Sequence, residues 1–255
     1  MDVRGGPSWP EGEKLKRFLV TQPLREGTRL TLSPEESKHA VRVMRLEAGA
    51  KVLLTNGKGL EAEAVLVSSD KSGAVLDIFT VREAGTRAFR LELLQGTLKG
   101  ARMDWLVEKA TELGVSAIHA VDTQFSVAGD RRERWVRVAQ AALKQSGNLN
   151  MPDLHEVTSL DEALGRLDAG FQGFLLSPTA EIGLAPAIRE SAKNGTVVLA
   201  IGPEGGFSEA EEKTLQDRGF RACRLSAQIL RGETAALTAA AVALHALEFP
   251  DSVAL

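Results

Sequence analysis

Hydrophobic and polar positions follow two different patterns in the two parts of this chain. Between residues 17 and 81, short apolar stretches are separated by turns rich in Gly, Asn, Asp and Ser. This pattern is typical of a small β-rich domain. Five strands are predicted, at Arg17–Val20, Thr28–Leu32, Lys51–Thr55, Glu61–Val67 and Ala74–Val81.

One helix interrupts these strands. Ser33 is a suitable N-cap, Pro34 suits the first helical position, and Glu36 completes a capping box, so we expect a helix from there to about Leu46. Its apolar face would consist of Ser37, Ala40, Val41 and Met44, and its positive face of Lys38, His39, Arg42 and Arg45. Such a positive face is either simply solvated or binds nucleic acid.

After a polar segment at 82–88, predicted strands and helices alternate. The strands are expected at Arg90–Gln95, Ala117–Val121, Leu154–Val157, Phe171–Leu176, Thr196–Ile201 and Arg221–Leu225. The helices are expected at Arg102–Leu113, Arg131–Gln145, Ser159–Leu167, Leu184–Ala192, Glu209–Arg218 and Glu233–Leu247, with Gly114 as the C′ residue of the first. This alternation predicts an α/β domain with a mostly parallel sheet covered by helices on both faces.

The segment VVLAIGPEGGFS, at 197–208, joins a buried strand to a helix. Ser208 and Glu211 form a capping box that fixes where the helix begins. The glycines allow either a plain turn or a loop whose N–H groups hold a ligand at the carboxyl edge of the sheet. The motif is neither G-x-G-x-x-G nor a P-loop, so it predicts no particular nucleotide.

A second loop, LSAQILRGETA at 225–235, follows the last predicted strand. Ile229 and Leu230 are apolar within this loop, which indicates packing against a ligand such as an adenine ring or against a partner subunit. Arg231 and Glu233 flank Gly232 with opposite charges. They form either a mutual ion pair or a charged catalytic corner.

Charge changes this picture locally rather than overall. The net charge of −3 argues against coating nucleic acid by electrostatics alone, but it leaves room for a basic face. Lys99 and Arg102 follow a strand end, on the ligand side of the predicted sheet. A second basic cluster, Arg131, Arg132, Arg134 and Arg137 around Trp135, suits phosphate binding or is a solvated face with Trp135 packed inward.

Several classes of protein are disfavoured by composition. No apolar stretch reaches the roughly 18 residues of a membrane span, so no membrane partner is expected. Residues 1–16 are polar and are predicted to be a disordered extension rather than a secretory signal. Cys223 is expected to be a buried thiol in a reducing, cytoplasmic compartment. The four histidines lack metal-ligand spacing, so no metal is expected.

Five segments together resemble one known family. They are GPEGGFSEAE at 202–211, ILRGETAALT at 229–238, KATELGV at 109–115, AALKQSG at 141–147 and HAVRVMRLEAGAKV at 39–52. In their order and spacing along the chain, these segments resemble the RsmE family of 16S ribosomal RNA uridine N3-methyltransferases. The resemblance extends from Arg17 onwards.

The resemblance implies an architecture and a set of partners. It implies a PUA-like RNA-binding β-barrel at 17–81, a linker at 82–88 and a SPOUT methyltransferase domain at 89–250. That domain would be a Rossmann-like parallel sheet whose C-terminal part forms a trefoil knot and binds S-adenosyl-L-methionine. The implied substrate is 16S rRNA in the 30S subunit, and the implied assembly is a homodimer.

The resemblance also implies site residues. The cofactor would be bound by Leu176, Ser177, Ile201, Gly202, Glu204, Gly205, Gly206, Leu225, Ile229, Leu230 and Thr234. The chemistry of methylation at N3 adds a hypothesis: Arg231 would stabilise the negative charge on the uracil, and Glu233, Glu204 or a group of the partner subunit would accept its N3 proton. Arg42, Arg45, Lys99 and Arg102 would contact RNA. Asn148 stands where many relatives carry an arginine, which removes one candidate RNA contact.

Three alternative functions are kept. The first is a SPOUT methyltransferase acting on tRNA or on another rRNA position. The second is a non-catalytic RNA-binding assembly factor with the same fold, which would not bind S-adenosylmethionine. The third, a nucleotide-dependent oxidoreductase, is disfavoured because the dinucleotide fingerprint is missing.

Overall fold

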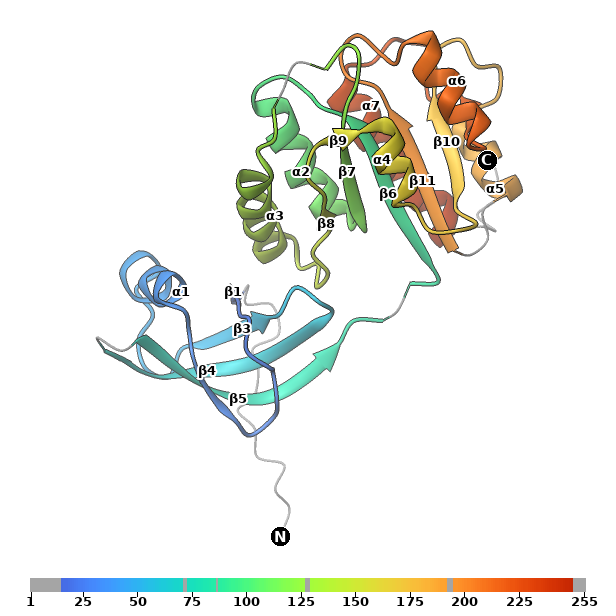
Figure 1. Ribbon diagram of the computed structural model, residues 1–255. Helices are drawn as coiled ribbons and strands as arrows, with labels where there is room; N and C mark the ends of the chain where they lie inside the picture. Colours follow the sequence, from blue (N-terminus) through green and yellow to red (C-terminus); the bar gives the residue numbers. More distant parts are fainter. Residues whose placement is uncertain (1–14, 71–72, 86, 127–128, 192–194, 250–255) are drawn as a thin grey trace. The chain divides into compact units, whose positions relative to one another are not determined.

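The computed structural model describes residues 15–70, 73–85, 87–126, 129–191 and 195–249 (Figure 1). The chain divides into two compact units. Unit 1 is Met1–Gly85 with Leu143–Asn150, and unit 2 is Thr86–Ala142 with Met151–Leu255. Most of the predicted N-terminal extension, residues 1–14, lies outside the described residues. Throughout the described ranges, no helix is long and apolar enough to cross a membrane.

Unit 1 contains a five-stranded sheet in the order β1-β3-β4-β5-β2. The strands are β1 (Lys16–Leu19), β2 (Arg29–Thr31), β3 (Lys51–Thr55), β4 (Leu60–Asp70) and β5 (Gly73–Glu83). β1 pairs with β3 in parallel, and the other neighbours are antiparallel. Buried positions alternate along β4 and β5, so one face of the sheet forms the core of the unit.

The predicted helix of unit 1 is shorter than expected. α1 (Pro34–Lys38) is capped by the Ser33 side chain as predicted, but it continues as a π-helical turn, η1 (His39–Val43). The N–H of Met44 bonds to the carbonyl of His39, one residue further back than in an α-helix. Arg45 then adopts a positive φ of 53°, which ends the helix before Leu46.

Unit 2 contains a parallel sheet in the order β12-β10-β11-β6-β7-β8, with β9 also paired to β7. Its strands are β6 (Phe89–Gly96), β7 (Ala117–Asp122), β8 (Asp153–Leu154), β9 (Thr158–Ser159), β10 (Gln172–Leu176), β11 (Gly195–Ile201) and β12 (Arg221–Cys223). The single strand predicted at Leu154–Val157 is wrong: two short strands stand there, separated by residues 155–157. The parallel sheet confirms the coarse α/β prediction.

Helices cover both faces of this sheet. They are α2 (Ala101–Leu113), α3 (Arg132–Ser146), α4 (Leu160–Gly165), α5 (Leu184–Ser191), α6 (Glu209–Asp217) and α7 (Gly232–Glu248). In Figure 1, α4 lies in front of the sheet and α7 behind it. Along β11, Val197 and Leu199 join the core beneath α2, α5 and α7, whereas Val198 and Ala200 join the core beneath α4 and α6. A strand buried on both faces explains the unbroken apolar run in the sequence.

Local signals placed most of the helix ends correctly. Ser208 and Glu211 form the predicted capping box at the start of α6. Gly114 ends α2 with a left-handed φ of 82°, as expected of a C′ glycine. Cys223 is buried, and burial raises the pKa of its thiol, so the thiol stays protonated and inert at neutral pH.

Candidate cofactor pocket

The loop after β11 is folded tightly on itself at the carboxyl edge of the sheet. A Cβ atom on Gly202 would lie 2.6 Å from the backbone carbon of Gly206, and one on Gly96 would lie 2.5 Å from Cδ of Pro203. Both distances are shorter than real Cβ contacts. Glycine is therefore required at Gly202 and Gly96, because any side chain would push the loop off the sheet.

This loop and the loop before α7 enclose one cavity of about 450 Å³. The volume lies in the range of about 300–1,000 Å³ that is typical of small-molecule sites. The lining residues come from three strand ends and from the start of α7: Leu176, Ser177, Pro178, Ile201, Gly202, Pro203, Glu204, Gly205, Gly206, Leu225, Ser226, Gln228, Ile229, Leu230, Arg231, Gly232 and Ala235.

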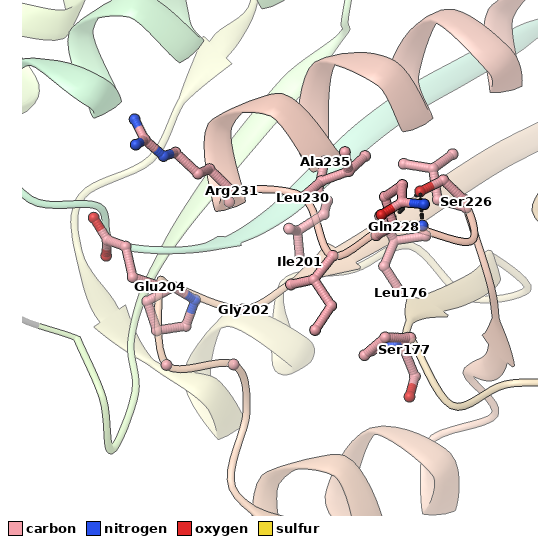
Figure 2. A pocket seen from close by; sticks show the side chains of 17 residues that line it. Leu176, Ser177, Ile201, Gly202, Glu204, Ser226, Gln228, Leu230, Arg231 and Ala235 are labelled. Atoms are coloured by element: carbon pink, nitrogen blue, oxygen red, sulfur yellow. Dashed lines mark hydrogen bonds between the residues drawn. The ribbon is translucent and has the colours of Figure 1, made fainter.

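The cavity has two polar ends and an apolar middle. Figure 2 shows Glu204 and Arg231 at one end, Ser177, Ser226 and Gln228 at the other, and Ile201 and Leu230 between them. At the second end, Ser226 Oγ accepts a hydrogen bond from the N–H of Gln228 at 3.0 Å and donates to its carbonyl at 2.7 Å. These bonds close a turn just before Ile229, which is 88% exposed.

Most residues that were predicted to bind the cofactor line this cavity. The exception is Thr234, which is exposed on α7 and does not line it. The cavity also contains residues that were not predicted as cofactor contacts: Pro178, Pro203, Ser226, Gln228, Gly232 and Ala235. Each is a chain neighbour of a predicted contact or lies one position further along, so extending the motifs by two residues would have included them.

The three proposed catalytic residues occupy different positions. Glu204 and Arg231 line the cavity, whereas Glu233 does not. Arg231 is the N-cap residue of α7 with an extended backbone (φ −66°, ψ 151°), and Glu233 lies within the first turn. Among the described residues, the Arg231 side chain has no ion-pair partner. The mutual Arg231–Glu233 pair, one of two alternatives left by the sequence, is therefore wrong.

Arg102 of α2 pairs with both carboxylates instead. Its Nη1 lies 2.5 Å from Glu204 Oε1, and its Nε lies 3.8 Å from Glu233 Oε1. The backbone N–H of Lys99 also donates to Glu204 Oε1 at 3.3 Å. Arg102, which was predicted to contact RNA, is thus attached to the loop of the cavity.

These contacts set the ionisation of Glu204. Partial burial acts to raise its pKa, but hydrogen bonds from backbone N–H groups and from Arg102 outweigh burial and hold the pKa below its usual range. Glu204 is consequently a carboxylate at neutral pH. Glu233 is 8% exposed, and its Oε2 has no hydrogen-bond partner within the described part of the chain.

The other basic candidates lie in separate places. Arg42 and Arg45 are exposed in unit 1, and Lys99 is exposed in unit 2. In the second basic cluster, Trp135 is buried at 2% exposure, so the inward-packed alternative is correct for it. Arg134 pairs with Asp104 at 2.7 Å, and Arg132 donates to the carbonyl of Leu154 at 2.7 Å. Two of its arginines are therefore already engaged within unit 2.

One further charged cluster lies inside unit 2. His119 Nε2 is 2.9 Å from Glu92 Oε2, and the rings of His119 and His155 stack at 4.4 Å. Arg90 Nε donates to the second oxygen of Glu92 at 3.1 Å. No group of three or more metal-ligating side chains occurs in the part of the chain that the structure describes.

Two protein families match the two parts of this chain. The family model described as an RNA methyltransferase domain matches residues 86–244, and the RNA methyltransferase PUA domain matches residues 32–79. The protein is thus an RNA methyltransferase with a PUA-like domain and a mixed α/β fold that is structurally like the SPOUT methyltransferases.

Individual relatives narrow the class. The chain is 32% identical to ribosomal RNA small subunit methyltransferase E of Bacillus subtilis over 87% of this chain and 91% of that protein. The solved structure of the Neisseria gonorrhoeae enzyme of the same name, bound to S-adenosylmethionine, matches with a TM-score of 0.82 and 29% identity over 91% of this chain and 97% of that one.

A protein from Legionella pneumophila, also solved with S-adenosylmethionine bound, matches with a TM-score of 0.83 and 29% identity. The match covers 92% of this chain and 98% of that one. The chain belongs to the family of ribosomal RNA small subunit methyltransferase E, whose members use S-adenosylmethionine to methylate 16S rRNA.

Proposed function

We propose that this chain transfers a methyl group from S-adenosylmethionine to N3 of one uridine in the 16S rRNA of the 30S subunit. The observation that carries the proposal is the cavity between the two glycine-marked loops, with Glu204 and Arg231 at one end. The sequence resemblance supplies the uridine N3 position.

The residues of the cavity fit the cofactor. Its volume, its apolar middle and its two polar ends suit an amphipathic nucleoside with an amino-acid tail. Ile201 and the backbone of residues 202–206 would hold the methionine and ribose parts of the cofactor. Leu225, Ile229 and Leu230 would contact its adenine. When bound, the cofactor supplies a methyl group already activated by the sulfonium, so the protein mainly aligns the reactants.

The charged end of the cavity suits the chemistry of the uracil. N3 becomes nucleophilic when its proton leaves, and negative charge then spreads onto O2 and O4. Arg231, exposed at the N-terminus of α7 without an ion-pair partner among the described residues, stabilises this charge. Glu204 is ionised and lines the cavity, which favours it over Glu233 as the acceptor of the N3 proton.

Arg102 and Glu233 then act as positioning residues. Arg102 holds the Glu204 carboxylate through its 2.5 Å hydrogen bond, and the buried Glu233 holds the other side of the guanidinium. The same ion pair keeps Glu204 a weak base, so proton transfer needs the developing charge on the uracil to be stabilised at the same time.

The remaining parts of the proposal concern architecture and RNA. Unit 1 is the PUA-like barrel, in which β5 continues to Glu83 beyond the boundary predicted at residue 81, and unit 2 is the SPOUT domain with a C-terminal trefoil knot. Phosphates of the RNA are contacted by Arg42, Arg45, Lys99 and Arg102. The enzyme is a cytoplasmic homodimer, because ribosome assembly takes place in the cytoplasm and SPOUT domains pair near the knot.

Nucleoside analysis tests this function. Hypomethylated 30S subunits are incubated with the purified chain and labelled S-adenosylmethionine, and the rRNA is digested for mass spectrometry. We expect label in N3-methyluridine from 16S rRNA. Label in another nucleoside, or transfer to tRNA in a parallel reaction, would show a different SPOUT specificity, and failure to bind the cofactor would indicate an assembly factor.

A further inference from the structure

An aromatic side chain next to the cavity has no role in the function described so far. Phe125 follows β7 by three residues, on the segment 123–126, and 44% of its surface is exposed. Exposing a phenylalanine ring costs free energy, because its apolar surface stays in water. An isolated exposed ring is common, so its surroundings decide whether it has a function.

The backbone that carries Phe125 is fixed by hydrogen bonds. The N–H of Ser126 donates to the carbonyl of Thr123 at 3.0 Å, and Ser126 Oγ accepts from the N–H of Thr123 at 3.1 Å. The N–H of Gln124 donates to Glu211 Oε1 at 2.8 Å. Phe125 is therefore presented by a closed turn rather than by a loose loop.

Glu211 ties this turn to the loop of the cavity. Its Oε1 accepts from Gln124, while its Oε2 accepts from the N–H of Ser208, the N-cap residue of α6. One carboxylate thus fixes both the turn carrying Phe125 and the end of the segment GPEGGFS. If the turn carrying Phe125 moved relative to the N-terminus of α6, one of these two hydrogen bonds to Glu211 would break.

Phe125 also touches the cavity loop directly. A Cβ atom on Gly205 would lie 2.8 Å from Cβ of Phe125 and 3.0 Å from its Cγ. The base of the ring is thus packed on the Cα of Gly205, a lining residue that adjoins Glu204. Phe125 therefore packs directly on the loop that carries Glu204, one residue along the chain from this carboxylate at the charged end of the cavity.

We infer that Phe125 is a stacking platform for the target pyrimidine, held out of its RNA stack at the mouth of the cavity. The inference rests on the proposed function. N3 lies on the pairing edge of uracil, so the base must leave its pair and its stack, which costs free energy. Its two faces are apolar, whereas Glu204 and Arg231 can satisfy only its polar edge. An aromatic ring packed on Gly205, next in the chain to Glu204, supplies the surface that a base face requires.

Substitutions at Phe125 separate stacking from mere bulk. Stacking of one base on an aromatic side chain is worth about 1–3 kcal/mol, so Phe125→Ala is expected to lower kcat/KM for 30S subunits by roughly 5- to 150-fold. Phe125→Leu keeps apolar volume but has no aromatic face, and we expect most of the loss to remain. Phe125→Tyr should retain most of the wild-type rate.

The control is Phe249→Ala. Phe249 is 54% exposed in the same unit, at the far end of the 17-residue helix α7. That length corresponds to about 24 Å from the start of the helix. We expect this variant to methylate like the wild type. Calorimetric titration should give the same S-adenosylmethionine affinity for all Phe125 variants, because stacking concerns the RNA base and not the cofactor.

Three results would overturn the inference: wild-type kcat/KM in Phe125→Ala, equal rates for Phe125→Leu and the wild type, or loss of cofactor affinity in Phe125→Ala. A drop in molecular mass of Phe125→Ala in sedimentation would overturn it too, because the ring would then hold two copies together. If the wild type itself forms no N3-methyluridine, the proposed function fails, a result that is distinct from any difference between variants.

Discussion

Unit 2 contains two charged clusters, one around Glu92 on strand β6 and one around Glu204 in the loop after β11, and they differ in what they leave available. In the buried cluster, Glu92 uses one carboxylate oxygen for Arg90 and the other for His119. In the cavity cluster, Glu204 has Arg102 as its partner, and nearby Arg231 has no ion-pair partner among the described residues. Both glutamates have a lowered pKa, so this shift alone does not identify a functional site.

What distinguishes the two clusters is access. Glu92 and His119 are 5% and 3% exposed, and for Glu92 burial is the largest influence, opposed by its bonds to His119 and Arg90. Glu204 faces a cavity large enough for a cofactor. A closed cluster whose carboxylate is engaged through both oxygens stabilises the fold, whereas a carboxylate that faces a cavity is available for chemistry. The first cluster should therefore govern stability and the second one activity.

The largest effect is expected in the buried cluster. Glu92→Ala leaves the buried His119 without its carboxylate partner, while the more exposed Arg90 keeps Asp153 at 3.3 Å, and breaking a buried pair such as Glu92–His119 costs about 3–5 kcal/mol. Urea unfolding measures the loss, and methylation per folded molecule should stay the same. Glu190→Ala is the control, since it breaks the exposed Arg221–Glu190 pair, worth about 0–1 kcal/mol. Equal losses of unfolding free energy in Glu92→Ala and Glu190→Ala would contradict a stabilising role of the buried cluster.

The next effect concerns the open cluster. Arg231→Ala should lower kcat by about 10²–10³, the usual result of removing one group that stabilises developing negative charge. Unfolding free energy should change little, because the side chain is exposed. Cofactor affinity should also change little, because the proposed partner of Arg231 is the uracil. Arg218→Ala, which removes an exposed arginine at the end of α6, should leave kcat unchanged. Loss of cofactor binding in Arg231→Ala would show that Arg231 binds the cofactor instead of stabilising charge on the uracil.

A methyl group in the cavity loop should weaken cofactor binding without touching any charge. Gly202→Ala forces a Cβ against the backbone of Gly206, and overpacking of this kind costs about 1–3 kcal/mol. We expect the S-adenosylmethionine affinity to fall roughly 5- to 150-fold in calorimetry. At Gly165 nothing lies within 4 Å of an added Cβ, so Gly165→Ala should bind normally.

The smallest effect is on pH dependence. Burial is the main cause that holds the pKa of His155 below its usual value of 6.5, helped by neighbouring His119. As pH falls below about 6.5, the unfolded chain therefore binds a proton that the native state does not, and stability decreases by at most about 1.4 kcal/mol per pH unit.

His155→Gln should flatten this slope between pH 7.5 and 5.5 in urea unfolding. His245→Gln, which alters an exposed histidine of α7, serves as the comparison. The Glu92 contribution behaves differently, because a lowered carboxyl pKa keeps its stabilisation intact above about 4.5 and loses it only in stronger acid. An unchanged slope in His155→Gln would contradict the assignment.

Sequence patterns predicted most of the fold because the signals are local. Three of these signals are the alternation of buried positions in β4 and β5, the apolar run of β11, which is buried on both faces, and the capping box of α6. Each depends on a few neighbouring residues. The π-helical turn at His39–Val43 was missed because its apolar spacing also suits an α-helix. Helix propensities do not predict the additional residue per turn that distinguishes a π-helical turn from an α-helical one.

The site was predictable in its loops but not in its contacts. The two glycine-marked segments stand out in the sequence, and most of the cavity lining comes from them. The Arg102–Glu204 pair joins residues 102 positions apart, and the contact of Phe125 with Gly205 joins different loops. Such pairs are brought together by the parallel sheet, and no local pattern encodes them.

Amide hydrogen exchange with and without S-adenosylmethionine tests the central claim most directly, because it reports on both clusters in one experiment. We predict that the cofactor slows exchange at residues 201–206 and 225–232, the two loops that enclose the cavity, and leaves β6 and β7 around Glu92 and His119 unchanged. Protection centred on the buried cluster, or none in the two loops, would contradict the account.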